Sequence, residues 1–456
     1  MSASGIIFSN IHDNNIPELT RLRTVASVPF ACRYRFIDFT LSNMVNSNIY
    51  NISVITHYNY QSLMDHIGSG KDWDLARRSG GIKILPPYIT AYANNANSLY
   101  QTRLQALKSV NYSISRITDD YVVMSDCDVI CNVDFNDIIA YHQKTDADMT
   151  IAVKTVDLTP ETAKINTIFS SDEEGRVTDV LAYPTNFSGT ADISLNIVVM
   201  KTKYLQQVVL DAIAHDYNSL TRDVIARNLD RMNYRVYKYE GYFACNSSFE
   251  EYYRNSMELL RDSAARDALF SVKNRPVYTK VRNSTPSYYS PTSTVKNSLI
   301  ADGCVIEGTV ENSIIFRGVK IGRNATVRNS IIMQDSIIGE GASLDCVITD
   351  KNAVITDKRR LSGADIQPYY ISKGKKISAV FYLRKNFLEK VFPQTPFQKL
   401  FGWEWDKYSL CNSGASNIVG TSSEKIAREL VTSPQRDVQI EFFVLAIVFL
   451  LRSEEY

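Results

Sequence analysis

The sequence predicts an α/β domain with a mostly parallel sheet, followed by a parallel β-helix. Over residues 1–255, short apolar runs alternate with segments of helical periodicity, a pattern typical of strands covered by helices on both faces. Over residues 291–377, apolar residues recur every six positions, as in the stacked coils of a β-helix. The length of 456 residues leaves room for three domains, at about 150 residues each.

The N-terminal region contains the predicted strands and helices of the α/β domain. Strands are expected at residues 6–9, 52–56 and 121–124, where short apolar runs are bounded by polar residues. Helices are expected at residues 38–48 and 99–110, where apolar residues recur at helical spacing. Ligands of parallel sheets bind beyond the carboxyl ends of the strands. We therefore expect the functional site directly after the first and third of these strands.

A six-residue apolar period marks the second region. One series consists of Ile315, Ile321, Val327 and Met333, and glycines separate the predicted turns. An α-helix repeats every 3.6 residues and a strand every two, so this period indicates coils that bury their apolar face by stacking. The alternative, a run of ordinary hairpins, is disfavoured. Residues 256–290 are expected to form a linker between the two regions.

The last region, residues 378–456, fits neither pattern and stays unassigned. It contains an uninterrupted apolar run at residues 442–451. A membrane-spanning helix needs about 20 such residues. We therefore expect a buried or partner-covered helix there, and no membrane anchor.

Composition excludes several classes of protein. The 50 Lys+Arg residues balance 49 Asp+Glu residues, which argues against a nucleic-acid binder. The seven cysteines are scattered without a C-x-x-C pair, which disfavours a disulfide framework or a zinc site. Cys127 and Cys131 lie four apart without a further Cys or His pair nearby, so we expect buried thiols. The first residues lack the features of a signal peptide, so a cytoplasmic protein is expected.

One segment carries a family resemblance. Residues 28–43 read VPFACRYRFIDFTLSN, which resembles the V-x-F-G-G-K-[FY]-R-I-I-D-F-x-L-S-N segment of glucose-1-phosphate adenylyltransferase. An α/β nucleotidyltransferase-like domain followed by a left-handed β-helix is similar to the layout of sugar-nucleotide pyrophosphorylases. The resemblance covers about residues 1–375. It implies that ATP and glucose 1-phosphate are joined to give ADP-glucose and pyrophosphate, with Mg²⁺ held by carboxylates.

The phosphate-binding positions that the resemblance implies are substituted. Active relatives have a glycine-rich loop, L-A-G-G-x-G-x-R-L, where residues 8–16 here read FSNIHDNNI. No glycine of the loop is present, and its arginine falls at Asn15. In the following R-A-K-P-A-V motif the arginine persists as Arg23, whereas the lysine has become Val25. Glycine lets backbone N–H groups approach phosphates, and cations stabilise the departing pyrophosphate, so these losses predict weak or absent catalysis.

The metal and sugar-phosphate positions are substituted as well. Asp126 matches one metal-binding aspartate of the family, but Cys245 stands where the second would be. The E-K-P motif for the sugar phosphate reads Ala182, Tyr183, Pro184 here. Magnesium needs oxygen ligands, so Mg²⁺ is doubtful and no cofactor is expected. We expect Asp126 to be a relic or a structural cap.

Three further side chains, His12, Arg33 and Arg35, carry groups that could serve a function. His12, in the substituted loop, is expected to be a surface histidine and no catalytic base. In the family, the lysine that matches Arg33 is associated with effector binding, and the arginine that matches Arg35 belongs to the same basic cluster. The resemblance therefore makes Arg33 and Arg35 candidates for binding an anionic effector; the alternative is that both are ordinary surface cations.

The pattern of losses is similar to that of GlgD-type subunits, the non-catalytic or weakly catalytic members of this family in Gram-positive bacteria. The resemblance implies a regulatory role in a heterotetramer with a catalytic GlgC-type subunit, in glycogen biosynthesis. Two alternatives stay open: an active nucleotidyltransferase with non-standard site residues, and a structural scaffold subunit. A hexapeptide acyltransferase is disfavoured, because no histidine follows His215.

Overall fold

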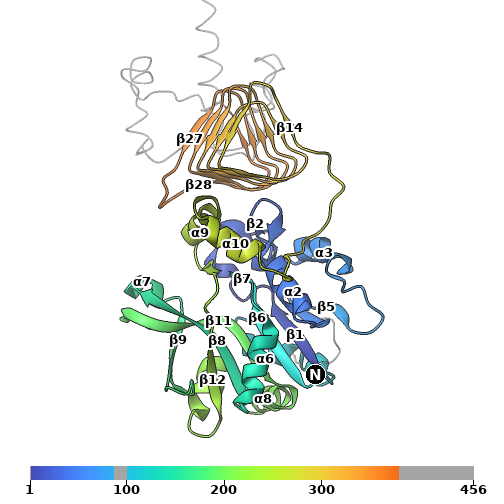
Figure 1. Cartoon of the computed structure of the whole chain (residues 1–456), viewed down its shortest axis with the longest axis vertical. Coiled ribbons are helices and arrows are strands. Elements are labelled where there is room, and N and C mark those ends of the chain that lie inside the picture. The colour runs from blue at the N-terminus through green and yellow to red at the C-terminus, as the bar shows by residue number, and fades with distance from the viewer. Residues whose placement is uncertain (1, 87–99, 379–456) are drawn as a thin grey trace, which may run out of the picture. The chain divides into compact units, whose positions relative to one another are not determined.

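The computed structural model describes residues 2–86 and 100–378 (Figure 1). These residues form an α/β domain and a β-helix, which confirms the predicted fold class. The unassigned region lies outside the described residues except for its first residue, and the apolar run at 442–451 lies outside them entirely. Among the described residues, every helix is too short or too polar to cross a bilayer.

A nine-stranded sheet forms the centre of the α/β domain. Its main path runs β10-β9-β11-β6-β1-β4-β5, and β8 pairs with β11 and β12. Strands β6, β1, β4 and β5 are mutually parallel, whereas β11 runs antiparallel to β6. The strands are β1 (Ala3–Phe8), β4 (Asn51–Ile55), β5 (Gly81–Leu85), β6 (Tyr121–Asp126), β8 (Met149–Leu158), β9 (Thr167–Ser171), β10 (Val177–Ala182), β11 (Gly189–Lys201) and β12 (Tyr234–Lys238).

Helices and two small sheets complete this domain. Strands β2 (Pro29–Phe30) and β3 (Tyr34–Arg35) pair antiparallel, as do β7 (Val129–Cys131) and β13 (Phe243–Cys245). The helices are α1 (Pro17–Thr20), α2 (Phe36–Asn46), α3 (Gln61–Ile67), α4 (Arg103–Ser109), α5 (Asn111–Ile114), α6 (Phe135–Lys144), α7 (Pro160–Ala163), α8 (Thr202–Ala214), α9 (Phe249–Arg261) and α10 (Ser263–Phe270). Single turns lie at η1 (Asp13–Asn15), η2 (Val25–Ser27), η3 (Lys71–Trp73), η4 (Leu220–Ile225) and η5 (Ala226–Asn228).

The predicted strands and helices of this domain are found with shifted ends. The three predicted strands correspond to β1, β4 and β6. Helix α2 begins two residues before the predicted start, because the Asp38 side chain accepts a 3.0 Å hydrogen bond from the backbone N–H of Arg35. Helix α4 begins later than predicted, because Thr102 caps it by accepting from the N–H of Gln105.

The predicted linker is too long at its N-terminal end. Helix α9 continues to Arg261, and α10 follows after Asp262, whose side chain accepts from the N–H of Ala264 at 2.8 Å. Ala265 and Leu269, four residues apart on α10, are buried. The first part of residues 256–290 therefore belongs to the packed core of the α/β domain.

Three parallel sheets form the faces of the β-helix, and each coil adds one strand to each sheet (Figure 1). The first sheet contains β14 (Tyr288–Tyr289), β17 (Val305–Ile306), β20 (Lys320–Ile321), β23 (Ile337–Ile338), β26 (Val354–Ile355) and β29 (Lys376–Ile377). The second contains β15 (Thr294–Lys296), β18 (Thr309–Glu311), β21 (Thr326–Arg328), β24 (Ser343–Asp345) and β27 (Arg360–Ser362). The third contains β16 (Leu299–Ile300), β19 (Ile314–Ile315), β22 (Ile331–Ile332), β25 (Val347–Thr349) and β28 (Tyr369–Ile371). The three parallel sheets and the six-residue apolar period together identify this region as a left-handed β-helix.

Residues with positive φ mark the corners of these coils, in most cases two positions before a strand. Glycine adopts this conformation without strain, and Asn and Asp tolerate it better than other residues. The corners therefore explain the spacing of Gly and Asn in this part of the sequence. The three corner series are Gly303, Gly318, Asp335, Asn352 and Gly374; Asn324, Gly341 and Lys358; and Asn297, Asn312, Asn329 and Cys346.

Candidate functional site

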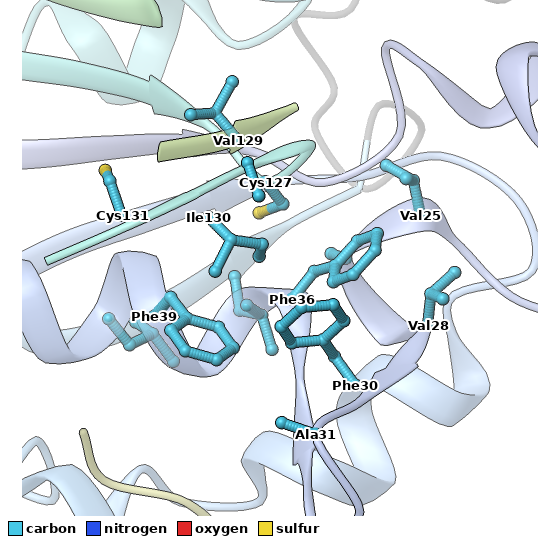
Figure 2. Packing of buried hydrophobic residues seen from close by; sticks show 14 of the residues in the cluster. Val25, Val28, Phe30, Ala31, Phe36, Phe39, Cys127, Val129, Ile130 and Cys131 are labelled. Atoms are coloured by element: carbon cyan, nitrogen blue, oxygen red, sulfur yellow. The ribbon is translucent and has the colours of Figure 1, made fainter. Parts of the chain in front are cut away.

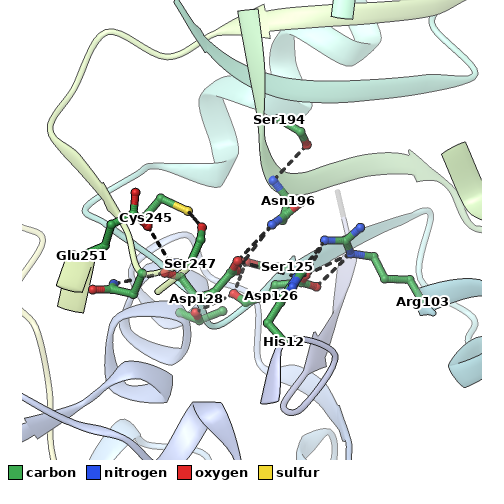
Figure 3. A network of polar contacts seen from close by, with 12 residues as sticks. His12, Arg103, Ser125, Asp126, Asp128, Ser194, Asn196, Cys245, Ser247 and Glu251 are labelled. Atoms are coloured by element: carbon green, nitrogen blue, oxygen red, sulfur yellow. Dashed lines mark hydrogen bonds and ion pairs between the residues drawn. The ribbon is translucent and has the colours of Figure 1, made fainter. Parts of the chain in front are cut away.

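Two strand ends define the candidate site. Strands β1 and β6 pair in parallel with Phe8 opposite Asp126, so the loop after β1 and the end of β6 lie together at the carboxyl edge of the sheet, as predicted. His12 comes from that loop, and Asp128 follows β6. Arg103, the first residue of α4, points into the same place (Figure 3).

Asp126 is engaged by two groups of this chain. The Nε atom of Arg103 lies 3.1 Å from Oδ1 and 3.0 Å from Oδ2 of Asp126, and Nη2 of Arg103 also donates to Oδ2. The Nε2 atom of His12 lies 2.7 Å from Oδ2 of Asp126 and 3.6 Å from Oδ2 of Asp128. Only 1% of the Asp126 side chain is exposed. Both of its carboxylate oxygens are therefore taken.

Opposite charges in this network stabilise each other, whereas the nearby Arg103 works to lower the pKa of His12. Burial opposes ionisation of Asp126, but the charge of Arg103 and the hydrogen bond from His12 hold the pKa of that carboxyl below its usual value. For His12, burial works to lower the pKa, yet the neighbouring Asp128 and Asp126 raise it overall. The pKa of Arg103 is raised against burial by Asp126. These shifts favour the ion pair between Asp126 and Arg103.

The predicted surface position of His12 is wrong, whereas the expectation that it is no catalytic base stays a prediction. Its side chain is only 15% exposed and lies between Asp126 and Asp128 (Figure 3). The partners come from the end of β6, more than a hundred residues away in sequence. Asp126, expected to be a relic of the metal site or a structural cap, is a carboxylate paired with Arg103 and His12.

The position of Val25 is part of the hydrophobic core. Val25 is 1% exposed and belongs to the same buried cluster as Phe30 and Phe36 (Figure 2). Its backbone N–H donates at 2.6 Å to Oδ1 of Asp13, whose pKa burial raises to about 8. Asn15, at the end of η1, is exposed. The hydrogen bond from Val25 to Asp13 therefore holds the loop after β1 against the segment that contains Val25.

The apolar cluster around Val25 also contains Cys127 and Cys131 (Figure 2). Both are buried free thiols, as expected from the sequence. Burial raises the pKa of each thiol. They act as small apolar side chains in this core.

Cys245 lies on β13, which pairs with β7 beside the network. Its Sγ atom lies 2.8 Å from Oγ of Ser247 (Figure 3). Burial, and then the charge of Asp128, raise the pKa of this thiol. Asn196 holds Asp128 from the other side, with Nδ2 at 3.4 Å from Oδ1 and 3.3 Å from Oδ2. A protonated thiol thus stands near the carboxylates.

The two residues at the sugar-phosphate positions carry no cation. Ala182 ends β10, and Tyr183 follows it with φ +55° and a side chain that leaves the residue 53% exposed. The backbone N–H of Tyr183 donates to the carbonyl of Asn166 at 3.1 Å. Neither side chain offers the carboxylate or ammonium of an E-K pair.

Arg33 and Arg35 lie in different environments. Arg33 is exposed, with its guanidinium 5.8 Å from the centre of the Tyr34 ring. Arg35 is 8% exposed and donates from Nη1 to the carbonyl and hydroxyl oxygens of Ser62, at 2.6 and 2.9 Å. Burial lowers the pKa of Arg35 to about 10. The structure therefore does not present the two as one exposed pair.

Comparisons with known proteins agree with this fold. A family described as nucleotidyl transferase matches residues 16–238, and one described as GlmU-like, C-terminal hexapeptide, matches residues 286–369. The glycogen biosynthesis protein GlgD of Bacillus subtilis (strain 168) is 33% identical over 370 residues, which cover 81% of this chain and 95% of that protein.

The chain belongs to the glucose-1-phosphate adenylyltransferase family.

Members of that family named for the enzyme are equally similar. The glucose-1-phosphate adenylyltransferase of Pseudothermotoga lettingae is 34% identical over 332 residues, or 71% of this chain and 75% of that protein. The enzyme of Geobacillus stearothermophilus is 34% identical over 324 residues, or 68% of this chain and 80% of that protein. The resemblance stated from residues 28–43 is thereby confirmed.

The Mg²⁺ implied by this family does not fit the residues present. Ligand atoms of His12, Asp126 and Asp128 lie within 4.8 Å of one another. However, Arg103 donates to both oxygens of Asp126, and the position of the second aspartate holds the Cys245 thiol. Magnesium requires nearly octahedral oxygen coordination. The arrangement neutralises its own carboxylates and offers no such set.

Sequence reasoning missed Arg103 and Asp128. Asp128 stands two residues after Asp126, and that spacing could have placed it at the same sheet edge. Arg103 gave no such signal, because its contact with Asp126 depends on how α4 packs against the sheet. The sequence therefore predicted where the network lies and that Asp126 belongs to the site, but not the contacts that Asp126 makes.

Proposed function

We propose that this chain is a non-catalytic or weakly active subunit of a cytoplasmic glucose-1-phosphate adenylyltransferase. It acts in glycogen biosynthesis, in a heterotetramer with a catalytic GlgC-type subunit that joins ATP and glucose 1-phosphate. The observation that carries the proposal is the engagement of Asp126 by Arg103 and His12. The similarity to a protein named for glycogen biosynthesis supports the pathway.

The substituted positions support the loss of catalysis. Val25 places an apolar side chain in the core where the family motif has lysine, and Asn15 and Tyr183 replace further cations. Removing one donor that stabilises developing negative charge costs about 2.7–4 kcal/mol of transition-state stabilisation. Several such losses together account for a rate far below that of active relatives.

Mixing purified subunits tests this function. The chain and the catalytic subunit from the same organism are purified separately and together, and ADP-glucose formation is followed. We expect background turnover from this chain alone. We expect kcat, substrate affinity or effector response of the partner to change about 5- to 150-fold in the complex, which corresponds to a coupling free energy of about 1–3 kcal/mol.

Two other outcomes would contradict the proposal in different ways. Turnover of about 1–1000 per second by the isolated chain would identify an active nucleotidyltransferase with non-standard residues. A stable complex without any kinetic change would identify a structural scaffold subunit. A catalytically dead variant of the partner, mixed with this chain, assigns any turnover to the subunit that produces it.

A second part of the proposal concerns an anionic small-molecule effector. Burial, together with the positive charges of Arg35, Arg23 and Arg282, lowers the pKa of Lys351 to about 6 against the opposing charge of Asp350. Cations that repel one another at a partly buried site favour the binding of an anion, because the anion reduces their repulsion. We propose that the effector contacts this cluster, which contains Arg35 but lacks Arg33.

Inorganic phosphate serves as the probe for this cluster. Calorimetry in two buffers of different ionisation enthalpy is expected to show proton uptake on binding, because an anion raises the pKa of Lys351. The Lys351→Met variant should lose that uptake, whereas Lys320→Met, at an exposed lysine on β20, should keep it. Binding that is unchanged in Lys351→Met contradicts this effector site and leaves the proposal about catalysis standing.

A further inference from the structure

The place of a metal ion in this site is filled by side chains of the chain itself. Arg103 reaches Asp126 from α4, and His12 reaches it from the loop after β1 (Figure 3). The described side chains of Arg103 and His12 are 17% and 15% exposed. Both side chains are therefore largely buried. They meet at Asp126, the carboxylate that matches a metal ligand of the family.

The guanidinium of Arg103 contacts the carboxylate oxygens of Asp126 that a metal ion would otherwise contact. Three hydrogen bonds run from Nε and Nη2 of Arg103 to the two oxygens of Asp126. A fork of N–H donors matches a carboxylate closely, and the guanidinium keeps its charge at any pH a protein survives. The imidazole of His12 adds a contact to Asp126 at 2.7 Å and lies 3.6 Å from Asp128.

The surrounding residues are consistent with a site that needs no ion. Nδ2 of Asn196 lies 3.3 Å from the nearer carboxylate oxygen of Asp128, and Cys245 contributes a thiol 2.8 Å from Ser247 instead of an oxygen ligand. Two carboxylates thus face one guanidinium, one imidazole and one amide. A divalent cation would bring its charge against Arg103.

We propose that Arg103, assisted by His12, is a built-in replacement for the divalent cation at Asp126. In this chain the ion pair occupies the coordination position, neutralises Asp126 and Asp128, and excludes Mg²⁺ and Mn²⁺. The remaining carboxylates stay able to bind a metal once the guanidinium is removed. This inference concerns the isolated chain and does not depend on the proposed regulatory function.

Binding of Mn²⁺ alone tests the proposal. Free Mn²⁺ is measured by electron paramagnetic resonance while the full-length chain is titrated. The wild-type chain is expected to bind no Mn²⁺ at this site, whereas Arg103→Met, which keeps an unbranched apolar stem and removes the guanidinium, gains one Mn²⁺ per chain. Adding Asp126→Asn to Arg103→Met should abolish the gain.

Matched variants separate this effect from the mere loss of an arginine. Arg317→Met removes another partly buried arginine, whose Nε lies 3.0 Å from Asp302, and it should not gain a Mn²⁺ site. Arg103→Lys keeps a positive charge and should bind far less Mn²⁺ than Arg103→Met. Wild-type binding of one Mn²⁺ that is lost in Asp126→Asn would overturn the proposal, as would a folded Arg103→Met chain without Mn²⁺ binding.

Folding of the key variant is covered by a second measurement. Arg103→Met leaves Asp126 buried without its main partner, so the variant can lose its fold. In that case it is refolded with excess MnCl₂ and, in parallel, with chelator. Greater recovery with Mn²⁺ supports the replacement, because a ligand that binds only the native state stabilises it. Equal recovery, or none, contradicts it.

Discussion

Arg23 of the α/β domain donates from Nη2 to both carboxylate oxygens of Asp350 on the β-helix, each at 2.7 Å. The two side chains are 2% and 4% exposed. Nearby, the Tyr370 hydroxyl donates to the carbonyl of Glu18 at 2.7 Å and to Asp350 at 3.3 Å. The segment that follows the substituted loop is thus bound to the β-helix through buried polar contacts.

Removing one partner of this pair is expected to destabilise the chain strongly. Asp350→Ala leaves the guanidinium of Arg23 buried without a counter-charge, which costs about 3–5 kcal/mol. Urea unfolding of the full-length chain measures the loss. The double variant Arg23→Met/Asp350→Ala should regain much of it, because no charge stays unpaired.

An exposed pair on the β-helix provides the control. Arg323 Nε lies 4.0 Å from Glu307 Oε1, and their side chains are 74% and 32% exposed. Glu307→Ala should therefore change the free energy of unfolding by less than about 1 kcal/mol. Equal losses in Asp350→Ala and Glu307→Ala would show that the buried pair has no special role.

Lys358 is expected to be replaceable by glycine with a gain in stability. It is exposed and has φ +57°, at the corner where the two preceding coils have Gly341 and Asn324. Glycine relieves the left-handed strain and loses more chain entropy, so Lys358→Gly should gain up to about 1 kcal/mol. The urea midpoint measures the change. Lys320→Gly, within strand β20, should lower that midpoint instead.

The stability of the α/β domain is expected to fall between about pH 6.5 and pH 4 because of His142. Burial and the charge of Lys201 lower its pKa to about 4, with Asp148 and Asp146 opposing. The unfolded chain therefore binds the proton more tightly, and about 3 kcal/mol is lost as the pH falls through this range. Above pH 6.5 this contribution is fully present.

Chemical unfolding at a series of pH values measures this dependence. His142 Nδ1 lies 2.8 Å from the Thr150 hydroxyl. The variant His142→Gln should reduce the slope between pH 6.5 and pH 4, and part of the slope should remain because burial also lowers the pKa of His57 to about 4. His215→Gln, at an exposed histidine, should leave it unchanged. An identical slope in wild type and His142→Gln would refute the assignment.

Restoring one missing carboxylate is expected to leave the isolated chain without activity. In Cys245→Asp, Arg103 and His12 still engage Asp126, and Val25 still supplies no cation. Pyrophosphate release from ATP and glucose 1-phosphate should therefore stay at the wild-type background. A rise of tenfold or more in turnover, about 1.4 kcal/mol of transition-state stabilisation, would show that the second carboxylate alone was limiting.

The parts of the fold that local patterns determine were predictable from the sequence. Strands β1, β4 and β6 follow from short apolar runs, because a strand buried on both faces must be apolar throughout. The β-helix follows from its six-residue period, because each coil is equivalent to the next. The ends of α2 and α4 shifted because Asp38 and Thr102 cap them.

The contacts of the site were not predictable to the same extent. His12 and Asp126 are 114 residues apart, and Arg103 lies 23 residues from Asp126. Such pairs form only when a loop and a helix pack against the sheet edge. A local sequence pattern does not predict that packing. Arg33 and Arg35 look equivalent in the sequence, yet only Arg33 is exposed, whereas Arg35 is buried and donates to Ser62.

The burial of Val25 has a consequence for any attempt to place a cation at this position. A lysine introduced there would place an ammonium group among Phe30 and Phe36, and an unpaired buried charge is severely destabilising. The single substitution Val25→Lys is therefore incompatible with the core as it is packed here. The apolar side chains around position 25 would have to change together with Val25 before a phosphate-binding cation could stand there.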